Sequence, residues 1–433
     1  MGKTLLYTYG SEVMRAKIGC PSGVTLVCAP LTVLQTQKMA ECPEDMIMLT
    51  MAGQLRGGKD SDPLLLGGLE KQIYAGKFKM IIAHPESWAT EMGQRILMTL
   101  KKKSMAILLV IDECHKMLYK HWIKIRPEMA DMTRRLRAFL VKGSPTACLT
   151  ATLTEDEIDA TSELMGYPEP AVVLAASPLQ SQFKLVVVKS PSSSTPSDGY
   201  TDVKGVFHPG FLHLFCRLYG DELIEKVRQG RQEEIRRLIF FFRTDAQLIT
   251  VFEFLREELG VRNARTAPFV MFTSSTMGQT ALVIAARAGE VPAILTTQAL
   301  EMGMNMPKQD IVIFSRPPDT GHSVLQGTGR TGRPLPDHPG CRRKALVYLL
   351  YNLYDLNTSK EMDEVVKRIC QEKEICLKMI LADYFSGDGA LIKKIPGWCC
   401  SVCDSKVKFH LRITIGNFIS RTFRRSSTCY SML

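Results

Sequence analysis

The chain has 433 residues, of which 45% are hydrophobic and 23% are charged, a balance typical of a globular protein with two or three domains. Its 55 Lys and Arg against 44 Asp and Glu give a net charge of +11, which suits a polyanionic partner without requiring one. No apolar run approaches the roughly 18 residues of a membrane span, and no apolar signal segment follows Met1. We therefore expect a protein that is neither embedded in a membrane nor secreted.

Thirteen cysteines are scattered along the chain. Because no secretion signal accompanies them, we expect these thiols to be reduced and most of them to be small core residues. The expected location is the nucleus, or the cytoplasm if the chain is prokaryotic.

The chain begins with Gly2-Lys3-Thr4, the last part of a phosphate-binding loop of the pattern G-x-x-x-x-G-K-[ST]. In such a loop, backbone N–H groups and a helix N-terminus surround the phosphates, Lys reaches the outer phosphates, and the hydroxyl reaches Mg²⁺. The first half of the pattern does not precede Gly2 in this sequence. Three residues alone are also compatible with an ordinary basic N-terminus.

Four short apolar runs in the first half of the chain predict buried strands separated by helical segments. Strands that alternate with helices predict a doubly wound parallel sheet, in which ligands bind outside the carboxyl ends of the strands. Polar or turn-forming residues follow every run. The runs and the residues after them are 24–29 with Pro30, 78–83 with His84, 108–111 with Asp112, and 147–149 with Thr150 and Thr152.

The third run enters Asp112-Glu113-Cys114-His115. An Asp at this position can hold Mg²⁺ on a nucleotide, and a neighbouring acid can orient the attacking water. The alternative is that the two acids simply begin a helix, because acidic residues are favoured in the first turn. The other motifs along the chain favour the first interpretation.

The second half repeats the alternation, with strands predicted at 238–242, 293–297 and 311–314. The segment from Gln326 to Arg333 then holds two Gly-Arg pairs on a glycine-rich turn at a helix. Arginines held in this way can stabilise the charge of a transferring phosphoryl group, whereas a single Gly-Arg pair would be explained as a solvated basic turn. A polar loop is predicted at 190–199, and the domain boundary near Ser177.

In their order along the chain, these motifs resemble those of superfamily 2 helicases, and within them the RecQ family. The narrower resemblance rests on residues 121–127, similar to the aromatic-rich loop and Arg-Pro signature of RecQ enzymes, and on residues 304–307, similar to their motif V. The matching segments are Gly2 to Thr4, Pro30-Leu31, Asp112 to His115, Thr150 to Thr152, Thr297 to Pro307, and Gln326 to Arg333.

The resemblance implies an α/β fold of two RecA-like domains, whose parallel sheets are flanked by helices, with ATP and Mg²⁺ bound between them. Residues 1–177 would form lobe 1, the ATP-binding domain, lacking its first strand and half of the phosphate loop. Residues 178–357 would form lobe 2, the helicase C-terminal domain. A helical segment at 358–406, with a zinc module that could be degenerate, and a basic tail at 407–433 would follow.

The resemblance also implies a role for each motif residue. The nucleotide would be bound by Gly2, Lys3, Thr4, Asp112, Gly303 and Asn305, with Thr4 and Asp112 on Mg²⁺. The catalytic set would be Asp112, Glu113, Gln326, Arg330 and Arg333, with Glu113 on the lytic water and Arg333 rather than Arg330 as the arginine finger. His115, Thr150 and Thr152 would couple nucleotide state to nucleic acid, which Pro30, His84, Trp122, Arg126 and Thr297 would contact.

Trp122 is the implied stacking residue, a contact worth roughly 1–3 kcal/mol with any base, although it could instead be a core aromatic. Residues 361–385 predict two helices, the second carrying Cys376, and Cys399, Cys400 and Cys403 follow. RecQ enzymes place a zinc module here, and structural zinc needs four N/S ligands. Because Cys399 and Cys400 are adjacent and Lys406 replaces a further family Cys, both a zinc site and a degenerate one stay open.

The expected function is an ATP-dependent 3′–5′ DNA helicase of RecQ type that acts on single-stranded DNA and duplex junctions. Two alternatives stay open. The truncated phosphate loop predicts a chain that binds nucleic acid without efficient ATP hydrolysis, and the superfamily motifs are also compatible with an RNA helicase. No protein partner is implied.

Overall fold

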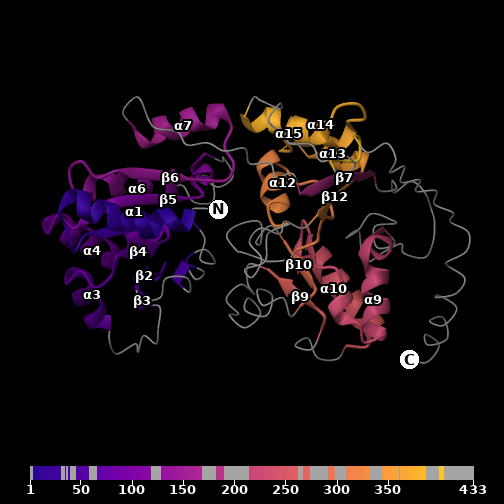
Figure 1. Ribbon diagram of the computed structural model, residues 1–433, viewed down its shortest axis with the longest axis horizontal. Helices are drawn as coiled ribbons and strands as arrows, with labels where there is room; N and C mark the ends of the chain where they lie inside the picture. The colour runs from indigo at the N-terminus through magenta and orange to yellow at the C-terminus, as the bar shows by residue number, and fades with distance from the viewer. Residues whose placement is uncertain are drawn as a thin grey trace, which may run out of the picture.

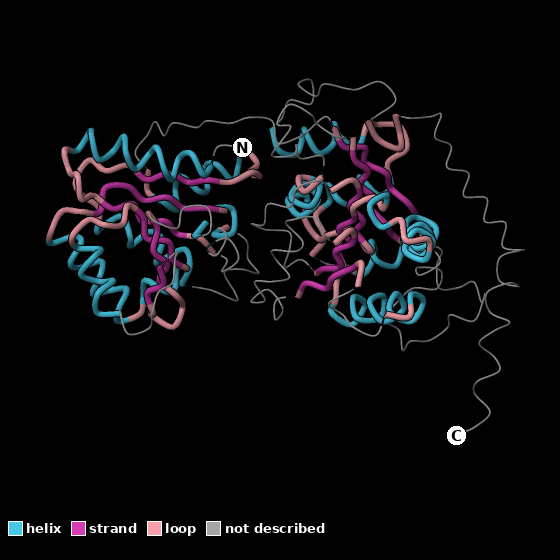
Figure 2. The backbone as a smooth tube through the Cα atoms, turned by 60° about the horizontal axis from the view of Figure 1, so that its bottom comes forward, coloured by secondary structure: helices cyan, strands magenta, loops and turns pink. Residues whose placement is uncertain are grey.

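The computed structural model of the chain is drawn in Figure 1. It describes residues 3–30, 35, 38–39, 45–57, 66–118, 128–167, 182–189, 214–261, 267–273, 291–297, 309–331, 344–359, 361–386 and 399–403. The predicted loop at 190–199 and the predicted domain boundary near Ser177 lie outside these residues. Two sheets lie side by side, one in each lobe, and Figure 2 shows helices on both sides of them.

The sheet of lobe 1 has the strand order β3-β2-β4-β1-β5-β6. The predicted strands are present as β1, β4, β5 and β6, whereas β2 and β3 were not predicted, and β3 pairs antiparallel with β2 at one edge. The strands are β1 (Val24–Cys28), β2 (Met46–Leu49), β3 (Leu55–Gly57), β4 (Met80–Ala83), β5 (Ala106–Asp112) and β6 (Thr146–Leu149).

Strand β5 is buried along its whole length because apolar side chains cover both faces of the sheet. Leu109 and Ile111 pack in one core cluster, and Leu108 and Val110 pack in the other. Helix α1 lies against β5 in the second cluster, where Gly10 faces Leu108. The helices of lobe 1 are α1 (Lys3–Ile18), α3 (Leu66–Tyr74), α4 (Glu91–Lys102), α6 (Glu128–Leu136) and α7 (Glu155–Met165), with short 3₁₀ turns η2 (Pro85–Ala89), η3 (Cys114–Met117) and η4 (Arg137–Phe139).

The sheet of lobe 2 has the order β7-β12-β11-β8-β10-β9, and all its strand pairs are parallel. The predicted strands are β8, β10 and β11. The strands are β7 (Phe183–Lys189), β8 (Leu238–Phe241), β9 (Phe269–Phe272), β10 (Ala293–Thr296), β11 (Ile311–Phe314) and β12 (Ala345–Tyr351). The helical elements are η5 (Cys216–Gly220, a π-helical turn), α9 (Asp221–Arg228), η6 (Gln232–Glu234), α10 (Asp245–Leu259), α12 (Gly321–Thr328) and α13 (Leu353–Thr358).

The two helices predicted after lobe 2 are α14 (Glu364–Gln371) and α15 (Leu377–Ser386), and they pack into the core of lobe 2. Val366 and Leu377 lie in one cluster with Phe183 of β7. Cys376 precedes α15 rather than lying on it, which corrects the expectation from the sequence. Together the elements confirm the expected α/β class, two domains with parallel sheets between helices. In the described part of the chain, no helix has the length and apolar character needed to cross a bilayer.

Candidate functional site

Asp112 and Glu113 lie at the carboxyl end of β5, where the sequence placed them, and both are buried. One oxygen of the Asp112 carboxylate, Oδ1, accepts a hydrogen bond from the backbone N–H of Glu113 at 3.0 Å. Glu113 adopts a left-handed conformation with φ of 51°. Such strain in a residue other than glycine persists where the surroundings impose it, and it concentrates at functional sites. The turn therefore orients two acids at the edge of the sheet where ligands bind.

His115 connects this turn to the end of β6. Its ring is fully buried, with Nδ1 at 2.8 Å from Thr150 Oγ1 and 3.5 Å from the Glu113 carboxylate. The Thr150 hydroxyl in turn accepts the backbone N–H of Thr152 at 3.1 Å. A ring that carries its proton on Nδ1 donates to Thr150 and leaves Nε2 free to accept a hydrogen bond.

Gln326 of lobe 2 supplies that hydrogen bond from α12. Its amide Nε2 lies 3.0 Å from His115 Nε2 and 3.5 Å from Thr152 Oγ1. The structure therefore brings Gln326 of lobe 2 together with His115, Thr150 and Thr152 of lobe 1, although Gln326 is at least 174 residues from each of them in sequence. We call these four residues the coupling cluster.

Close packing positions the end of α12. A Cβ on Gly327 would lie 2.2 Å from the Phe314 ring of β11, so only glycine lets the helix approach the sheet this closely. Thr320 caps the other end through the Ser323 N–H. Arg330 follows in the next turn, where its N–H donates to Gly327 O at 3.1 Å and its side chain is buried.

The other residues that are expected to bind the nucleotide are placed only in part. Among the described residues, helix α1 extends from Lys3, and Figure 1 shows its N-terminal end on the side of lobe 1 that faces lobe 2. The side chains of Lys3 and Thr4 lie outside the described residues. The same holds for Gly2, Gly303, Asn305 and Arg333.

Three residues expected to contact nucleic acid follow parallel strands. Pro30 follows β1 and is buried, His84 follows β4 with 1% of its surface exposed, and Thr297 follows β10 and is half-buried. His84 Nδ1 pairs with the Glu86 carboxylate. The buried His84 ring is therefore held inside lobe 1. Trp122 and Arg126 lie outside the described residues, and the nucleic-acid roles of all five stay predictions.

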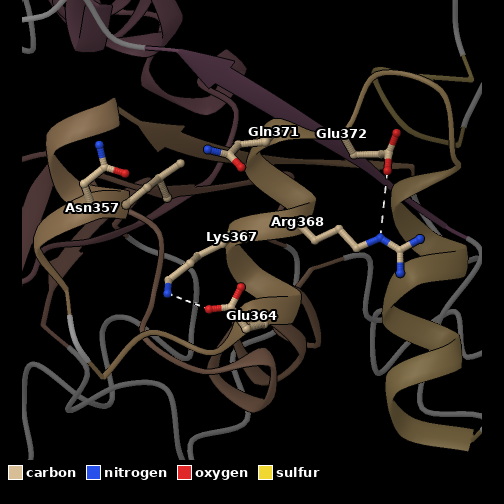
Figure 3. Close-up of a pocket in the computed structure, with 7 residues that line it drawn as sticks. Asn357, Glu364, Lys367, Arg368, Gln371 and Glu372 are labelled. Carbon is tan, nitrogen blue, oxygen red and sulfur yellow. Dashed lines mark hydrogen bonds and ion pairs between the residues drawn. The ribbon is translucent and has the colours of Figure 1, made fainter.

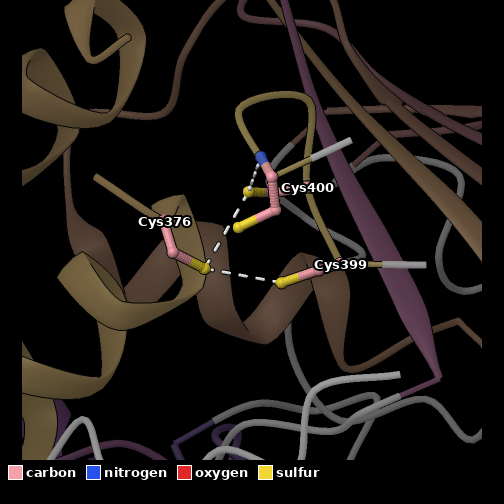
Figure 4. A group of neighbouring side chains, drawn as sticks. Cys376, Cys399 and Cys400 are labelled. Atoms are coloured by element: carbon pink, nitrogen blue, oxygen red, sulfur yellow. Dashed lines mark hydrogen bonds between the residues drawn. The ribbon is translucent and has the colours of Figure 1, made fainter. Parts of the chain in front are cut away.

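Cys376, Cys399, Cys400 and Cys403 come together beside α15 (Figure 4). Their sulfur atoms all lie within 4.8 Å of one another, with Cys376 at 3.4 Å from Cys399 and 3.9 Å from Cys400. Adjacency of Cys399 and Cys400 therefore does not keep either sulfur out of the cluster. Zn–S bonds of about 2.3 Å in a tetrahedron separate sulfurs by about 3.8 Å, so the all-sulfur donor set fits zinc.

The cysteine cluster is fixed to lobe 2 and lies beside a buried cation. The N–H of Leu185 in β7 donates to Cys399 O at 3.2 Å, and Ser401 N–H donates back to Leu185 O at 2.8 Å. Lys378 is 2% exposed, with its Nζ 4.2 Å from the centre of the Phe183 ring. Burial lowers the pKa of Lys378, whereas the cysteine sulfurs oppose this shift. A neighbouring cation favours the thiolate form that binds metals.

Sequence reasoning missed one contact at the lobe crossing. His322 Nε2 of α12 lies 3.0 Å from Glu157 Oε2 of α7. The sequence Thr154-x-x-Glu157 has the pattern of a capping box at a helix start, and His322 precedes Gln326 by one helical turn. These two signals gave no indication that the side chains meet, because the contact depends on how the lobes pack.

A polar pocket of about 570 Å³ lies away from these groups, beside α13 and α14 (Figure 3). Lys367 in its wall pairs with Glu364 at 2.7 Å, and Arg368 lies 3.9 Å from Glu372. Because these charges neutralise one another locally, the pocket has no net charge to select a nucleotide or nucleic acid.

Comparison with known families agrees with the geometry. Residues 1–161 match the DEAD/DEAH box helicase family, and residues 220–334 match the helicase conserved C-terminal domain. No curated protein sequence matches the chain.

Solved helicase structures share the fold at low sequence identity. Saccharomyces cerevisiae Dbp5 bound to RNA and ADP BeF3 is 13% identical with a TM-score of 0.52, covering 84% of this chain and 76% of Dbp5. The DUF1998 helicase MrfA bound to DNA and AMPPNP is 16% identical with a TM-score of 0.55, covering 88% of this chain and 50% of MrfA. Mycobacterium smegmatis helicase Lhr bound to ssDNA and AMP-PNP is 16% identical with a TM-score of 0.52, covering 81% and 42%. The chain therefore has the RecA-like helicase fold and carries the N-terminal and C-terminal domains of a superfamily 2 helicase.

Proposed function

We propose that the chain is an ATP-dependent DNA helicase of RecQ type that moves 3′ to 5′ on single-stranded DNA and acts at duplex junctions. The observation that carries this proposal is the contact between Gln326 of lobe 2 and His115 of lobe 1. A hydrogen bond there connects the acids at the end of β5 to the opposite lobe. Changes at a nucleotide beside these acids would therefore move lobe 2 relative to lobe 1.

In this proposal, the two acidic residues at the end of β5 bind the metal and orient the water for ATP hydrolysis. Asp112, together with Thr4, would hold Mg²⁺, which neutralises charge on the phosphates when bound. The Glu113 carboxylate would orient the attacking water, and its left-handed backbone keeps it beside Asp112. Gly2, Lys3, Gly303 and Asn305 would bind the nucleotide, and Arg330 and Arg333 would balance charge on the phosphoryl group, with Arg333 as the arginine finger.

The nucleic acid would lie across both lobes. Its phosphates would be held near the carboxyl ends of β1, β4 and β10, where Pro30, His84 and Thr297 lie, while Arg126 and a base stacked on Trp122 would add contacts. The coupling cluster would report the state of the nucleotide to this surface through His115, Thr150 and Thr152. The net charge of +11 supports a polyanionic partner.

The RecQ assignment is supported by the 121–127 sequence and by the four cysteines beside α15. A zinc ion held by Cys376, Cys399, Cys400 and Cys403 would join α15 to the segment that pairs with β7. We take residues 1–177 and 178–357 as the two motor lobes and 358–406 as the zinc-binding segment, which shares the core of lobe 2.

ATP hydrolysis by the 433-residue chain tests the assignment of roles. We expect single-stranded DNA to stimulate hydrolysis, and Glu113→Gln to lower the stimulated rate by at least about a hundredfold, because water activation is lost while the side chain keeps its size. Glu91→Gln, an exposed carboxylate at the start of α4, is the matched control and keeps the wild-type rate. A Glu113→Gln variant that keeps full activity contradicts the assignment.

The nucleic acid class is tested by unwinding. Matched DNA and RNA duplexes with a 3′ single-stranded extension are compared, together with DNA duplexes that carry a 5′ extension. Faster unwinding of the 3′-extended DNA duplex supports the proposal. Unwinding of RNA duplexes alone would support an RNA helicase instead.

A second candidate is a chain that binds nucleic acid without efficient ATP hydrolysis. The observation favouring it is the outer edge of β6, with which no strand among the described residues pairs. All four residues of β6 are partly exposed, and Leu6, Tyr9 and Val13 form an exposed stripe on α1. Calorimetric titrations of the chain with an ATP analogue and with single-stranded DNA separate the candidates. Tight binding of the analogue favours the motor, whereas binding of DNA with no binding of the analogue favours the second candidate.

A further inference from the structure

His322 is a buried imidazole that contacts three separate parts of the molecule. It is the second residue of α12 and has 2% of its surface exposed. Its Nε2 atom lies 3.0 Å from the Glu157 carboxylate across the lobe crossing. Neither residue belongs to the helicase motifs, so the proposed mechanism gives neither a role.

Glu157 is held ready for this contact by its own helix. Its N–H donates to Thr154 Oγ1 at 3.3 Å, while Oε2 of its carboxylate accepts the Thr154 N–H at 2.8 Å, so the two residues form a capping box. The same oxygen faces His322. Burial raises the pKa of Glu157, but the contact with His322 and the hydrogen bonds with Thr154 outweigh it and hold the pKa below its usual value. Glu157 is therefore an anion near neutral pH.

The rest of the His322 ring is enclosed by aromatic groups. The His115 ring stacks on it with centroids 6.0 Å apart and an angle of 10° between the planes. Tyr384 and Phe385 of α15 meet it edge-on at 5.9 and 4.9 Å. The charged or titratable groups around His322 are thus Glu157 from α7, His115 from η3 and Tyr384 from α15, whose hydroxyl donates to Asp363 at 3.3 Å.

Residues four apart on a helix lie on the same face, so His322 and Gln326 both point at lobe 1. Gln326 meets His115 and Thr152, whereas His322 meets Glu157 and the face of His115. An interaction with an ionised carboxylate is stronger than one between neutral groups. His322 Nε2 lies 3.0 Å from the Glu157 carboxylate and is almost fully shielded from water.

We propose that Glu157 and His322 are positioning residues that fasten α12 to lobe 1, so that Gln326 meets His115 in register. Their effect on ATP turnover rests on the proposed function, whereas the fastening itself does not. Through Tyr384 and Phe385, the same ring also connects the lobe crossing to α15, which begins directly after Cys376.

Energy transfer between dyes on the two lobes tests the proposal in the full chain. Dyes are attached through p-azidophenylalanine introduced at Met98 of α4 and Ile249 of α10, which are 62% and 47% exposed. Molecules are counted as closed when energy transfer shows the two lobes together and as open when it shows them apart. The closed-to-open ratio is then compared among the wild type, Glu157→Gln, His322→Leu, the double variant, and the conservative His322→Gln. Glu163→Gln, an exposed carboxylate on the same helix α7, is the matched control.

We expect His322→Leu to lower the closed-to-open ratio roughly tenfold, the change that corresponds to the loss of one polar contact with a charged group. Glu157→Gln keeps the capping box, because Gln serves at this position, yet it lowers the ratio several-fold. It causes no further loss in the His322→Leu background, since the pair is already broken. His322→Gln retains most of the wild-type ratio because its amide still donates, and Glu163→Gln retains all of it.

A closed-to-open ratio unchanged by His322→Leu overturns the proposal. So does a Glu157→Gln substitution that lowers the ratio by the same factor in the wild type and in the His322→Leu variant. Should His322→Leu fail to fold, Glu157→Gln on the opposite lobe decides the question by itself. If the closed-to-open ratio changes as expected but the chain hydrolyses no ATP, the positioning role stands and the proposed function is wrong. If hydrolysis depends on Glu113 but the ratio does not depend on Glu157 and His322, the proposed function stands and the positioning role is wrong.

Discussion

At the scale of single residues, the motifs predicted where the acidic side chains lie but not which side chains contact one another. Asp112 and Glu113 stand at the end of a buried strand because the run before them is apolar and β-branched, a pattern readable without a structure. The left-handed backbone of Glu113 was not readable, because a glutamate carries no sign that its neighbours impose a positive φ. The pair Glu157–His322 was equally hidden, since it joins two domains.

Gly327 gives the sharpest prediction at this scale. The Phe314 ring, 2% exposed and stacked on Phe241 at 5.0 Å, has no room to move away from a methyl group on Gly327. We expect Gly327→Ala to lower the free energy of unfolding of lobe 2 by about 1–3 kcal/mol through overpacking. Urea denaturation of the purified chain measures the change.

The control for that substitution is Gly329→Ala in the same turn. Gly329 has φ of −64°, which alanine adopts readily, and its added Cβ would meet only carbonyl oxygens at 3.3 Å. Its cost should be less than half that of Gly327→Ala. Equal costs at the two positions would mean that contact with Phe314 does not limit α12.

At the scale of elements, content of Val, Ile and Phe did not by itself decide which strands were predicted, because β7 and β9 carry these residues and were not predicted. The runs at β1, β5, β8 and β11 carry these residues and are buried on both faces. Strand β2 has the sequence Met-Ile-Met-Leu, which fits a short helix equally well, and its pairing with β4 over a long separation decides its structure. Pairing of Cys399 and Ser401 with β7 likewise arises only in the folded chain.

Helix α9 is joined to the segment before β8 by an ion pair whose pH dependence can be measured. Arg236 Nε donates to the Glu222 carboxylate at 3.0 Å. Burial raises the pKa of Glu222, but the hydrogen bonds from Arg236 and Lys226 lower it more, so it lies below its usual value. A carboxyl with a lowered folded-state pKa stabilises the fold fully above the unfolded value of about 4.3, and this stability is lost as the pH falls through the folded-state pKa.

We therefore expect Glu222→Gln to destabilise lobe 2 by about 0.5–1 kcal/mol near pH 7, a figure reduced for solvent screening of the half-exposed Arg236. The difference from the wild type should shrink as the pH falls below about 4.3 and through the folded-state pKa. Urea denaturation at pH 7 and over a series of acidic pH values measures it, with the exposed Glu233→Gln as control. A difference that does not change with pH would mean that the charge of Glu222 is irrelevant.

At the scale of the whole molecule, the order of motifs predicted two RecA-like lobes, and the structure confirms them. What the sequence could not provide was the way the last segment joins lobe 2. Helices α14 and α15 share one apolar core with Phe183 and Val347 rather than forming a separate layer. Motif spacing carries no information about such sharing, because it depends on which faces meet after folding.

Zinc content tests the join between the last segment and lobe 2. We expect the purified chain to hold one zinc ion, and Cys376→Ser to lose it, because three thiolates leave a tetrahedral site incomplete. Lobe 2 of that variant should also unfold at lower temperature, since the metal stabilises only the folded chain. Metal analysis and calorimetry measure both changes, with Cys20→Ser in lobe 1 as control. Full zinc content in Cys376→Ser would contradict the site.

A double-mutant cycle on ATP hydrolysis tests most directly the proposal that the contact between His115 and Gln326 carries a signal from lobe 1 to lobe 2. Hydrolysis is measured with and without single-stranded DNA for the wild type, His115→Ala, Gln326→Ala and the double variant. We predict that each single substitution reduces stimulation by DNA roughly tenfold. The double variant should lose no more stimulation than the more impaired of the two single variants. Losses that multiply in the double variant, or stimulation that survives both single substitutions, would contradict a shared contact between the lobes.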